Sequence, residues 1–178
     1  MCQSEGRSAE ADQSVSCGGQ GLITLLCVGR NKEKALRLLQ EEYVKRILPF
    51  SRIEVIEVKD EANIHTDREK EADKVKELEA DRVLEKIKPT DHVILLDLHG
   101  QMLDSMQLSQ KLETWSMHHS HLVFVIAGSL GPGKQLVQRA DYRWKLSDLT
   151  FTHLMTRILI LEQIYRGYMI LNGRSYHK

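Results

Sequence analysis

The segment from His121 to Gly133, HLVFVIAGSLGPG, limits the possible folds more than any other part of the sequence. Its apolar residues from Leu122 to Ala127 follow one another without a polar break, and glycines and a proline come directly after them. A short continuous apolar run with β-branched and aromatic members is typical of a strand buried on both faces, as in a parallel sheet. Glycines at its carboxyl end let the backbone turn sharply and approach a ligand closely. The segment predicts either one wall of a small-molecule site or a tight strand-to-helix turn without a ligand.

Strands and helices are predicted to alternate along the whole chain. Besides the run at Leu122–Ile126, strands are expected at Leu22–Val28, Ile53–Val58, His92–Leu98 (closed by a turn at His99-Gly100) and Tyr142–Leu146. Helices are expected at Glu33–Leu48, from the capping box Thr66–Glu69 to Ile87, after a second capping box at Asp104–Gln107, and at Pro132–Ala140 and His153–Leu171. This order predicts an α/β fold: a mainly parallel sheet with helices on both faces. The charged face of the helix ending at Ile87 is interpreted as solvated.

The chain is expected to hold one domain, over residues 22–178. Residues 1–21 are rich in Ser, Gly, Gln and Glu and lack the apolar core of a secretory signal. They predict a disordered leader, or an artefact of expression or start-site choice, outside the fold.

Charge and cysteine content exclude several classes of protein. The 178 residues carry 25 basic and 25 acidic side chains, which argues against coating nucleic acid through bulk charge but leaves room for a local basic patch. No apolar run approaches the ~20 residues that span a membrane. Cys27 is predicted to be a buried thiol, and the lack of CxxC spacing argues against a disulfide scaffold or zinc site and for a reducing cytoplasm. The cluster His118, His119 and His121 is interpreted as solvated loop histidines rather than metal ligands, so no metal is expected.

The glycine loop lacks the features of the common phosphate-binding loops. Gly133-Lys134 is followed by Gln135, so no hydroxyl is present for magnesium as in a P-loop, and the spacing is not GxGxxG. The chain also lacks the GxSxG nucleophile elbow. These absences favour, weakly, a ligand without phosphates.

The helix at His153–Leu171 is apolar around most of its circumference. Such a helix must be buried nearly all round. This predicts a subunit interface, with a central core helix as the alternative.

Five motifs in order, with a matching C-terminus, resemble one family. They are Val123–Gly131, Arg139–Tyr142, Leu146–His153, Arg157 and Leu161–Arg166, followed by Tyr176–Lys178. From Leu22 to Lys178 the sequence closely resembles the ribosomal RNA large subunit methyltransferase H family of the SPOUT superfamily. The resemblance implies a C-terminal trefoil knot, which periodicity cannot indicate, and a homodimer through the C-terminal helix.

The resemblance also implies a reaction and a cofactor. The reaction is methyl transfer from S-adenosylmethionine to N3 of a pseudouridine in large-subunit (23S) ribosomal RNA, as free RNA or in the assembled ribosome. The family's cofactor positions carry over to Leu96, Gly128, Ser147, Asp148, Leu149, Thr150, Phe151 and Thr152.

Several positions differ from the usual family pattern. Ala127-Gly128 stands where the family has two adjacent glycines, Thr152 where it has proline, and Leu154 where it has Gln or Pro. In the tail, Arg174-Ser175 replaces an acidic or apolar residue followed by Pro. These differences bear on cofactor affinity and loop rigidity.

The expected catalytic residues are Tyr176, His177, Lys178 and Arg157. Methyl transfer requires two reactants held in line, and the N3 proton must leave. We expect the tail to fold over the nucleotide, with Lys178 stabilising negative charge and His177 either taking the proton or stacking and hydrogen bonding. Arg157 is expected to pair with an acidic group or a phosphate, and His153 to position the cofactor.

Two rival functions remain open at the level of sequence. One is a non-catalytic α/β protein that binds a nucleotide or metabolite at the glycine loop. The other is an RNA-binding module that has lost cofactor affinity through Ala127 and Leu154. Basic residues gather in the C-terminal half, at Lys134, Arg139, Arg143, Lys145, Arg174 and Lys178, which suits contact with RNA.

Overall fold

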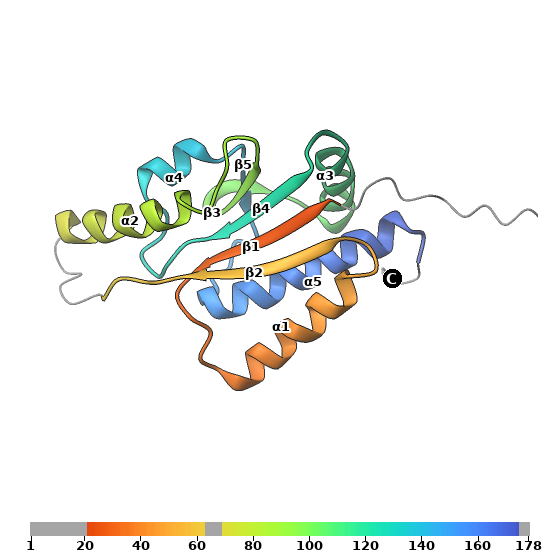
Figure 1. Ribbon diagram of the computed structural model, residues 1–178, viewed down its shortest axis with the longest axis horizontal. Coiled ribbons are helices and arrows are strands. Elements are labelled where there is room, and N and C mark those ends of the chain that lie inside the picture. The colour runs from red at the N-terminus through yellow and green to blue at the C-terminus, as the bar shows by residue number, and fades with distance from the viewer. Residues whose placement is uncertain (1–20, 63–68, 175–178) are drawn as a thin grey trace, which may run out of the picture.

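Five strands form one parallel sheet in the computed structural model, which describes residues 21–62 and 69–174 (Figure 1). The strands are β1 (Leu22–Val28), β2 (Arg52–Val58), β3 (His92–Met102), β4 (His121–Ile126) and β5 (Tyr142–Lys145). They lie in the order β2-β1-β4-β3-β5, and every neighbouring pair is parallel. The predicted α/β fold is confirmed. The trefoil knot stays a prediction.

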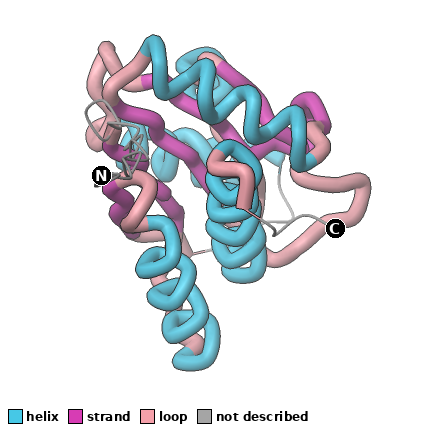
Figure 2. The backbone as a smooth tube through the Cα atoms, turned by 90° about the vertical axis from the view of Figure 1, so that its right-hand side faces the viewer, coloured by secondary structure: helices cyan, strands magenta, loops and turns pink. Residues whose placement is uncertain are grey.

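Helices cover both faces of this sheet. They are α1 (Lys34–Ile47), α2 (Glu69–Leu84), α3 (Ser105–His118), α4 (Lys134–Arg139) and α5 (His153–Leu171). Figure 1 shows α2 and α4 on one face and α1 and α5 on the other, and in Figure 2 the strands lie between helices. None of the helices in the described ranges is long and apolar enough to cross a membrane.

The start of α3 is capped as its sequence predicts. The Asp104 carboxylate accepts from the Gln107 backbone N–H at 2.7 Å, and the Gln107 side chain accepts from the Asp104 backbone N–H at 2.9 Å. The other predicted box begins at Thr66, which lies outside the described residues; α2 starts at its last member, Glu69.

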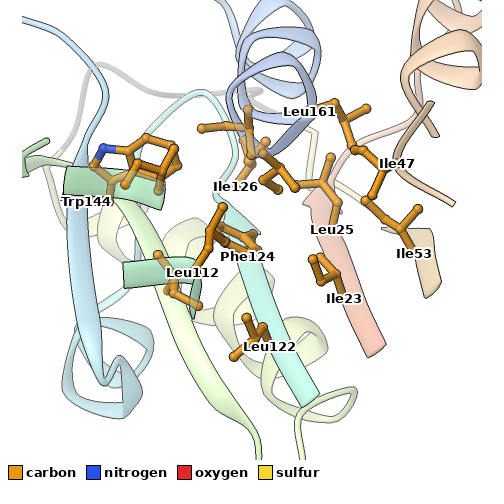
Figure 3. Packing of buried hydrophobic residues seen from close by; sticks show 14 of the residues in the cluster. Ile23, Leu25, Ile47, Ile53, Leu112, Leu122, Phe124, Ile126, Trp144 and Leu161 are labelled. Carbon is orange, nitrogen blue, oxygen red and sulfur yellow. The ribbon is translucent and has the colours of Figure 1, made fainter. Parts of the chain in front are cut away.

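Successive side chains of the central strands point alternately into two separate hydrophobic cores, one on each face of the sheet. On β4, Phe124 and Ile126 face the α1, α3 and α5 side, where they pack with residues such as Leu161 (Figure 3). Val123 and Val125 face α2 and α4. Burial on both faces explains why this strand reads as an unbroken apolar run. Cys27 is fully buried in β1 as predicted, and burial raises the pKa of its thiol to about 12.

The third strand is longer than predicted. A turn was expected at His99-Gly100, but β3 continues to Met102 and pairs again with β5 after an irregularity between Leu96 and Gln101. A Cβ on Gly100 would lie 2.5 Å from the Arg143 carbonyl oxygen. Glycine therefore marks a close approach of two backbones rather than a turn.

The final helix is covered largely by its own chain. Tyr165 packs against Tyr43 of α1 with ring centroids 6.4 Å apart, and Gly167 lies against Leu112 of α3. Packing against α1 and α3 covers much of the apolar surface of α5, as expected if α5 is a central core helix. The predicted subunit interface remains a prediction.

The clustered histidines differ in their surroundings, and the interpretation as solvated loop residues is wrong for His121. His121 belongs to β4, where its Nδ1 lies 2.9 Å from Asp91 Oδ1 and its Nε2 lies 2.8 Å from Thr24 Oγ1. His119 stacks on His92 with centroids 4.4 Å apart. Only His118 is exposed, as expected.

Candidate functional site

A cavity of about 860 Å³ opens at the carboxyl ends of β3, β4 and β5. Its walls are the middle of β3 from Leu96 to His99, the loop from Ile126 to Pro132, and the segment from Leu146 into the first turn of α5. These segments follow different strands of one parallel sheet, so the sheet order brings their ends together. The glycine loop therefore forms one wall of a cavity, as the first sequence hypothesis predicts.

Most of the residues expected to bind a cofactor line this cavity. Those that line it are Leu96, Gly128, Ser147, Leu149, Thr150, Phe151 and Thr152. Asp148 does not; its carboxylate lies 2.5 Å from Lys145 Nζ, beside β5. Leu149 is 70% exposed and lines the cavity together with the exposed Leu98 and Phe151, and such a group of exposed apolar residues is typical of a surface that covers a ligand or a partner.

The conformation of the glycine loop is stabilised by a hydrogen bond within its backbone and by packing against α2. Gly131 has φ +89°, a conformation that favours glycine, and its N–H donates to the Gly128 carbonyl at 3.0 Å. A Cβ on Gly128 would collide with Glu79 Oε2. A side chain at this position would therefore require Glu79 to move.

Glu79 packs behind the glycine loop, a position that the sequence did not reveal. It lies on the charged helix interpreted as solvated, yet it is buried, and burial raises the pKa of its carboxyl. Its Oε1 accepts from the Glu61 backbone N–H at 3.0 Å. One acid in a run of charged residues gives no sequence signal that it faces inward.

An acid, a histidine and an arginine form a cluster at the mouth of the cavity. Asp97 is buried, and its Oδ2 accepts from Arg143 Nε at 2.7 Å. Its Oδ1 accepts from the His99 backbone N–H at 2.9 Å and lies 3.3 Å from His99 Nδ1. Burial alone would raise the pKa of Asp97, but these donors hold it below its usual value. The cluster fixes an imidazole that is 85% exposed at the cavity mouth.

His153 lines the cavity from the start of α5. Burial is the main cause that lowers the pKa of this imidazole, and the nearby Arg157 charge lowers it further. Near neutral pH His153 is therefore uncharged, which suits the positioning role expected of it.

Arg157 lies beneath the site and does not line the cavity. Its side chain is fully buried, its Nη1 donates to Glu57 Oε1 at 2.5 Å, and its Nη2 donates to the carbonyls of Val28 and Gly29 at 3.1 and 2.7 Å. Glu57 is the acidic partner expected for it. In this position Arg157 holds the end of β1 against α5. The other expected catalytic residues, Tyr176, His177 and Lys178, lie outside the described residues.

Comparison with known proteins gives two findings. The profile of a family described as "Predicted SPOUT methyltransferase" matches residues 22–177. A solved structure described as "a probable methylase family protein from Haemophilus influenzae Rd KW20" is similar with a TM-score of 0.48 and 8% identity. The similarity covers 85% of this chain and 66% of that one. This second likeness is too distant to bear on function.

Proposed function

Because this chain belongs to the SPOUT methyltransferase family, we propose that it methylates N3 of a pseudouridine in large-subunit ribosomal RNA with S-adenosylmethionine as methyl donor. The observation that carries this proposal is the meeting of three segments, expected separately to bind the cofactor, around one cavity. These are β3 at Leu96, the loop at Gly128, and residues 147 and 149–152.

The size and the lining of the cavity support the proposal of this cofactor. Its volume of about 860 Å³ falls in the range of roughly 300–1,000 Å³ common for small-molecule sites. Trp144 also lines it, and in the described part of the chain the buried indole N–H of Trp144 has no hydrogen-bond partner. Leu96, Gly128 and the 147–152 loop would hold the cofactor, which supplies an electrophilic methyl group on a sulfonium.

The residues around the cavity would act mainly by positioning. The glycine loop admits a ligand close to its backbone. An uncharged His153 does not repel a cationic sulfonium. Lys178, in the tail, would stabilise the negative charge left when the N3 proton departs, and His177 would accept that proton or stack on the nucleotide. We further propose a homodimer through α5, acting on free ribosomal RNA or on the assembled ribosome.

Calorimetry with S-adenosylmethionine tests the cofactor. We expect micromolar binding by the full chain, about tenfold weaker binding for Leu149→Ala because apolar contact is lost, and no change for Leu38→Ala. Leu38 is a matched control because it is an exposed leucine on α1, away from the cavity. Absence of binding would contradict the proposal and favour a non-catalytic RNA-binding protein, the rival suggested by Ala127 in the cavity wall.

Mass analysis of ribosomal RNA tests the substrate. RNA from a strain that lacks the protein is expected to gain one methyl group on a pseudouridine when it, or the intact ribosome, is incubated with protein and cofactor. Removal of residues 176–178 should abolish this gain while cofactor binding is largely retained. Full activity in that truncation would contradict the role proposed for the tail.

A further inference from the structure

A second cavity, of about 650 Å³, lies beside the end of β1 and takes no part in methyl transfer as proposed above. It is formed by the loop after β1, the first turns of α1 and the neighbouring strand β2. The lining residues used below are Arg30, Asn31, Lys32, Arg37, Gln40, Glu41 and Glu57. We call it the basic cavity.

Three cationic side chains of the basic cavity form no ion pair within the described part of the chain. Arg30, Lys32 and Arg37 are exposed, and none of their side chains has a hydrogen-bond or ion-pair partner among the residues that the structure describes. Arg139 and Arg143, by contrast, pair with carboxylates. Of the acids that line the cavity, Glu57 is engaged by Arg157, which leaves Glu41 as the opposing charge. The free charge therefore favours an anion.

Buried polar atoms in the same cavity also lack partners. Asn31 is 5% exposed, and its backbone N–H donates to Glu57 Oε1 at 2.8 Å. Both its side-chain amide atoms, Oδ1 and Nδ2, are buried and have no partner in the described chain, and the same holds for Gln40 Oε1. An unmade buried hydrogen bond costs about 1–3 kcal/mol, so such groups mark a place where a ligand completes the set. Asn31 offers one donor and one acceptor side by side.

We propose that the basic cavity binds a ribose–phosphate unit of an RNA strand. The phosphate contacts Arg30, Lys32 and Arg37, and the Asn31 amide exchanges hydrogen bonds with the ribose 2′-hydroxyl, which donates and accepts. The choice of RNA among polyanions rests on the proposed function.

The position of the basic cavity suits an RNA strand that also reaches the first cavity. The loop after β1 leaves the edge of the sheet at which α5 begins (Figure 1). Gly29, with φ +88°, turns the chain there, and Arg157 bonds its carbonyl. Glu57 lines the basic cavity and pairs with Arg157, one helical turn from His153, which lines the first. A nucleotide in one cavity therefore has neighbours within reach of the other.

Fluorescence anisotropy of the full chain with a labelled uridine decamer tests the phosphate contacts. This probe contains no pseudouridine. The variant Arg30→Ala/Lys32→Ala/Arg37→Ala is compared with Lys70→Ala/Lys74→Ala/Lys86→Ala, which removes equal charge from exposed residues on and after α2. Each phosphate contact on a single strand contributes about 0.7 to the slope of log affinity against log salt, so we expect the first variant to reduce that slope by about 2 and the control to leave it unchanged. Equal effects in both variants would overturn the proposal.

A deoxyuridine decamer tests the ribose contact. Wild type is expected to prefer RNA, and Asn31→Ala should lose most of that preference while its thermal midpoint stays close to that of wild type. If Asn31→Ala does not fold, Asn31→Asp, which keeps the shape, is measured instead. An unchanged preference for RNA would overturn the ribose contact. Binding of an acidic peptide as tight as RNA, with the same sensitivity to the triple variant, would overturn the choice of RNA.

Calorimetry with S-adenosylmethionine separates this proposal from the proposed function. If wild type binds the cofactor but RNA binding does not depend on the basic cavity, the inference fails alone. A second outcome is that wild type fails to bind the cofactor, while the triple variant shows the expected reduction in the slope of log RNA affinity against log salt. In that case the proposed function is contradicted and the RNA site is supported.

Discussion

Arg157 is the buried charge on which the architecture of the site depends most. It is fully buried and joins α5 to Glu57 and to the last carbonyls of β1. We predict that Arg157→Met lowers the free energy of unfolding in urea by about 3 kcal/mol or more, because the Glu57 carboxylate loses its cationic partner and two carbonyls lose the guanidinium donor. The control Arg46→Met breaks an exposed pair with Glu42 and should lower the free energy of unfolding much less. Equal losses would contradict the special role of Arg157.

His153 should make stability depend on pH. Its pKa is lower in the folded chain than its ordinary value of 6.5, mainly through burial. The unfolded chain therefore takes up the proton first, and stability is lost as the pH falls below 6.5 toward the folded pKa. We predict that between about pH 7 and pH 5 the free energy of unfolding falls more steeply in wild type than in His153→Gln, which retains His92. Parallel curves would show that His153 does not titrate in this way.

At the scale of elements, the extension of β3 past the expected turn depends on the absence of a side chain at Gly100. A Cβ at Gly100 would meet the Arg143 carbonyl and the Trp144 backbone nitrogen at 2.5 and 2.8 Å, and backbone atoms cannot move aside as a flexible side chain does. We predict that Gly100→Ala lowers stability by about 3 kcal/mol through overpacking and parts β3 from β5, as measured by urea unfolding and amide exchange. The control Gly21→Ala, with its nearest atom at 3.5 Å, should change stability by less than about 0.5 kcal/mol. Similar values for both would contradict this account.

The same elements show what periodicity can and cannot predict. The strand at Leu22–Val28 and the helices beside it follow from apolar spacing, because that spacing reports burial within one element. The second half of β3 and the inward position of Glu79 depend on which segment lies opposite, and a single sequence carries no such information. The cavity was predictable because the ends of parallel strands share one edge, whereas the Asp97–Arg143 pair depends on the strand order, in which β5 lies beside β3.

At the scale of the whole molecule, the proposed dimer predicts that exposed apolar residues near the start of α5 lie in the subunit interface. Met155, on the first turns of α5, is 41% exposed, and the large apolar side chain of Phe151 precedes it. We predict that wild type sediments as a dimer and that Met155→Asp shifts it toward monomer, because a carboxylate would be buried in the interface. The control Met117→Asp, at the exposed end of α3, should leave the dimer intact. A monomeric wild type would contradict the proposed homodimer.

The order of the strands also determines when the fold can form during synthesis. The central strand β1 is translated well before β4, the strand with which it pairs. Until β4 emerges, one edge of β1 carries unpaired backbone N–H and C=O groups, and β2 alone protects the other edge. Pairing between distant segments makes folding slow and leaves nascent intermediates open to aggregation. Completion of this sheet is therefore a late event, and the emerging N-terminal half depends on protection of that edge until β4 arrives.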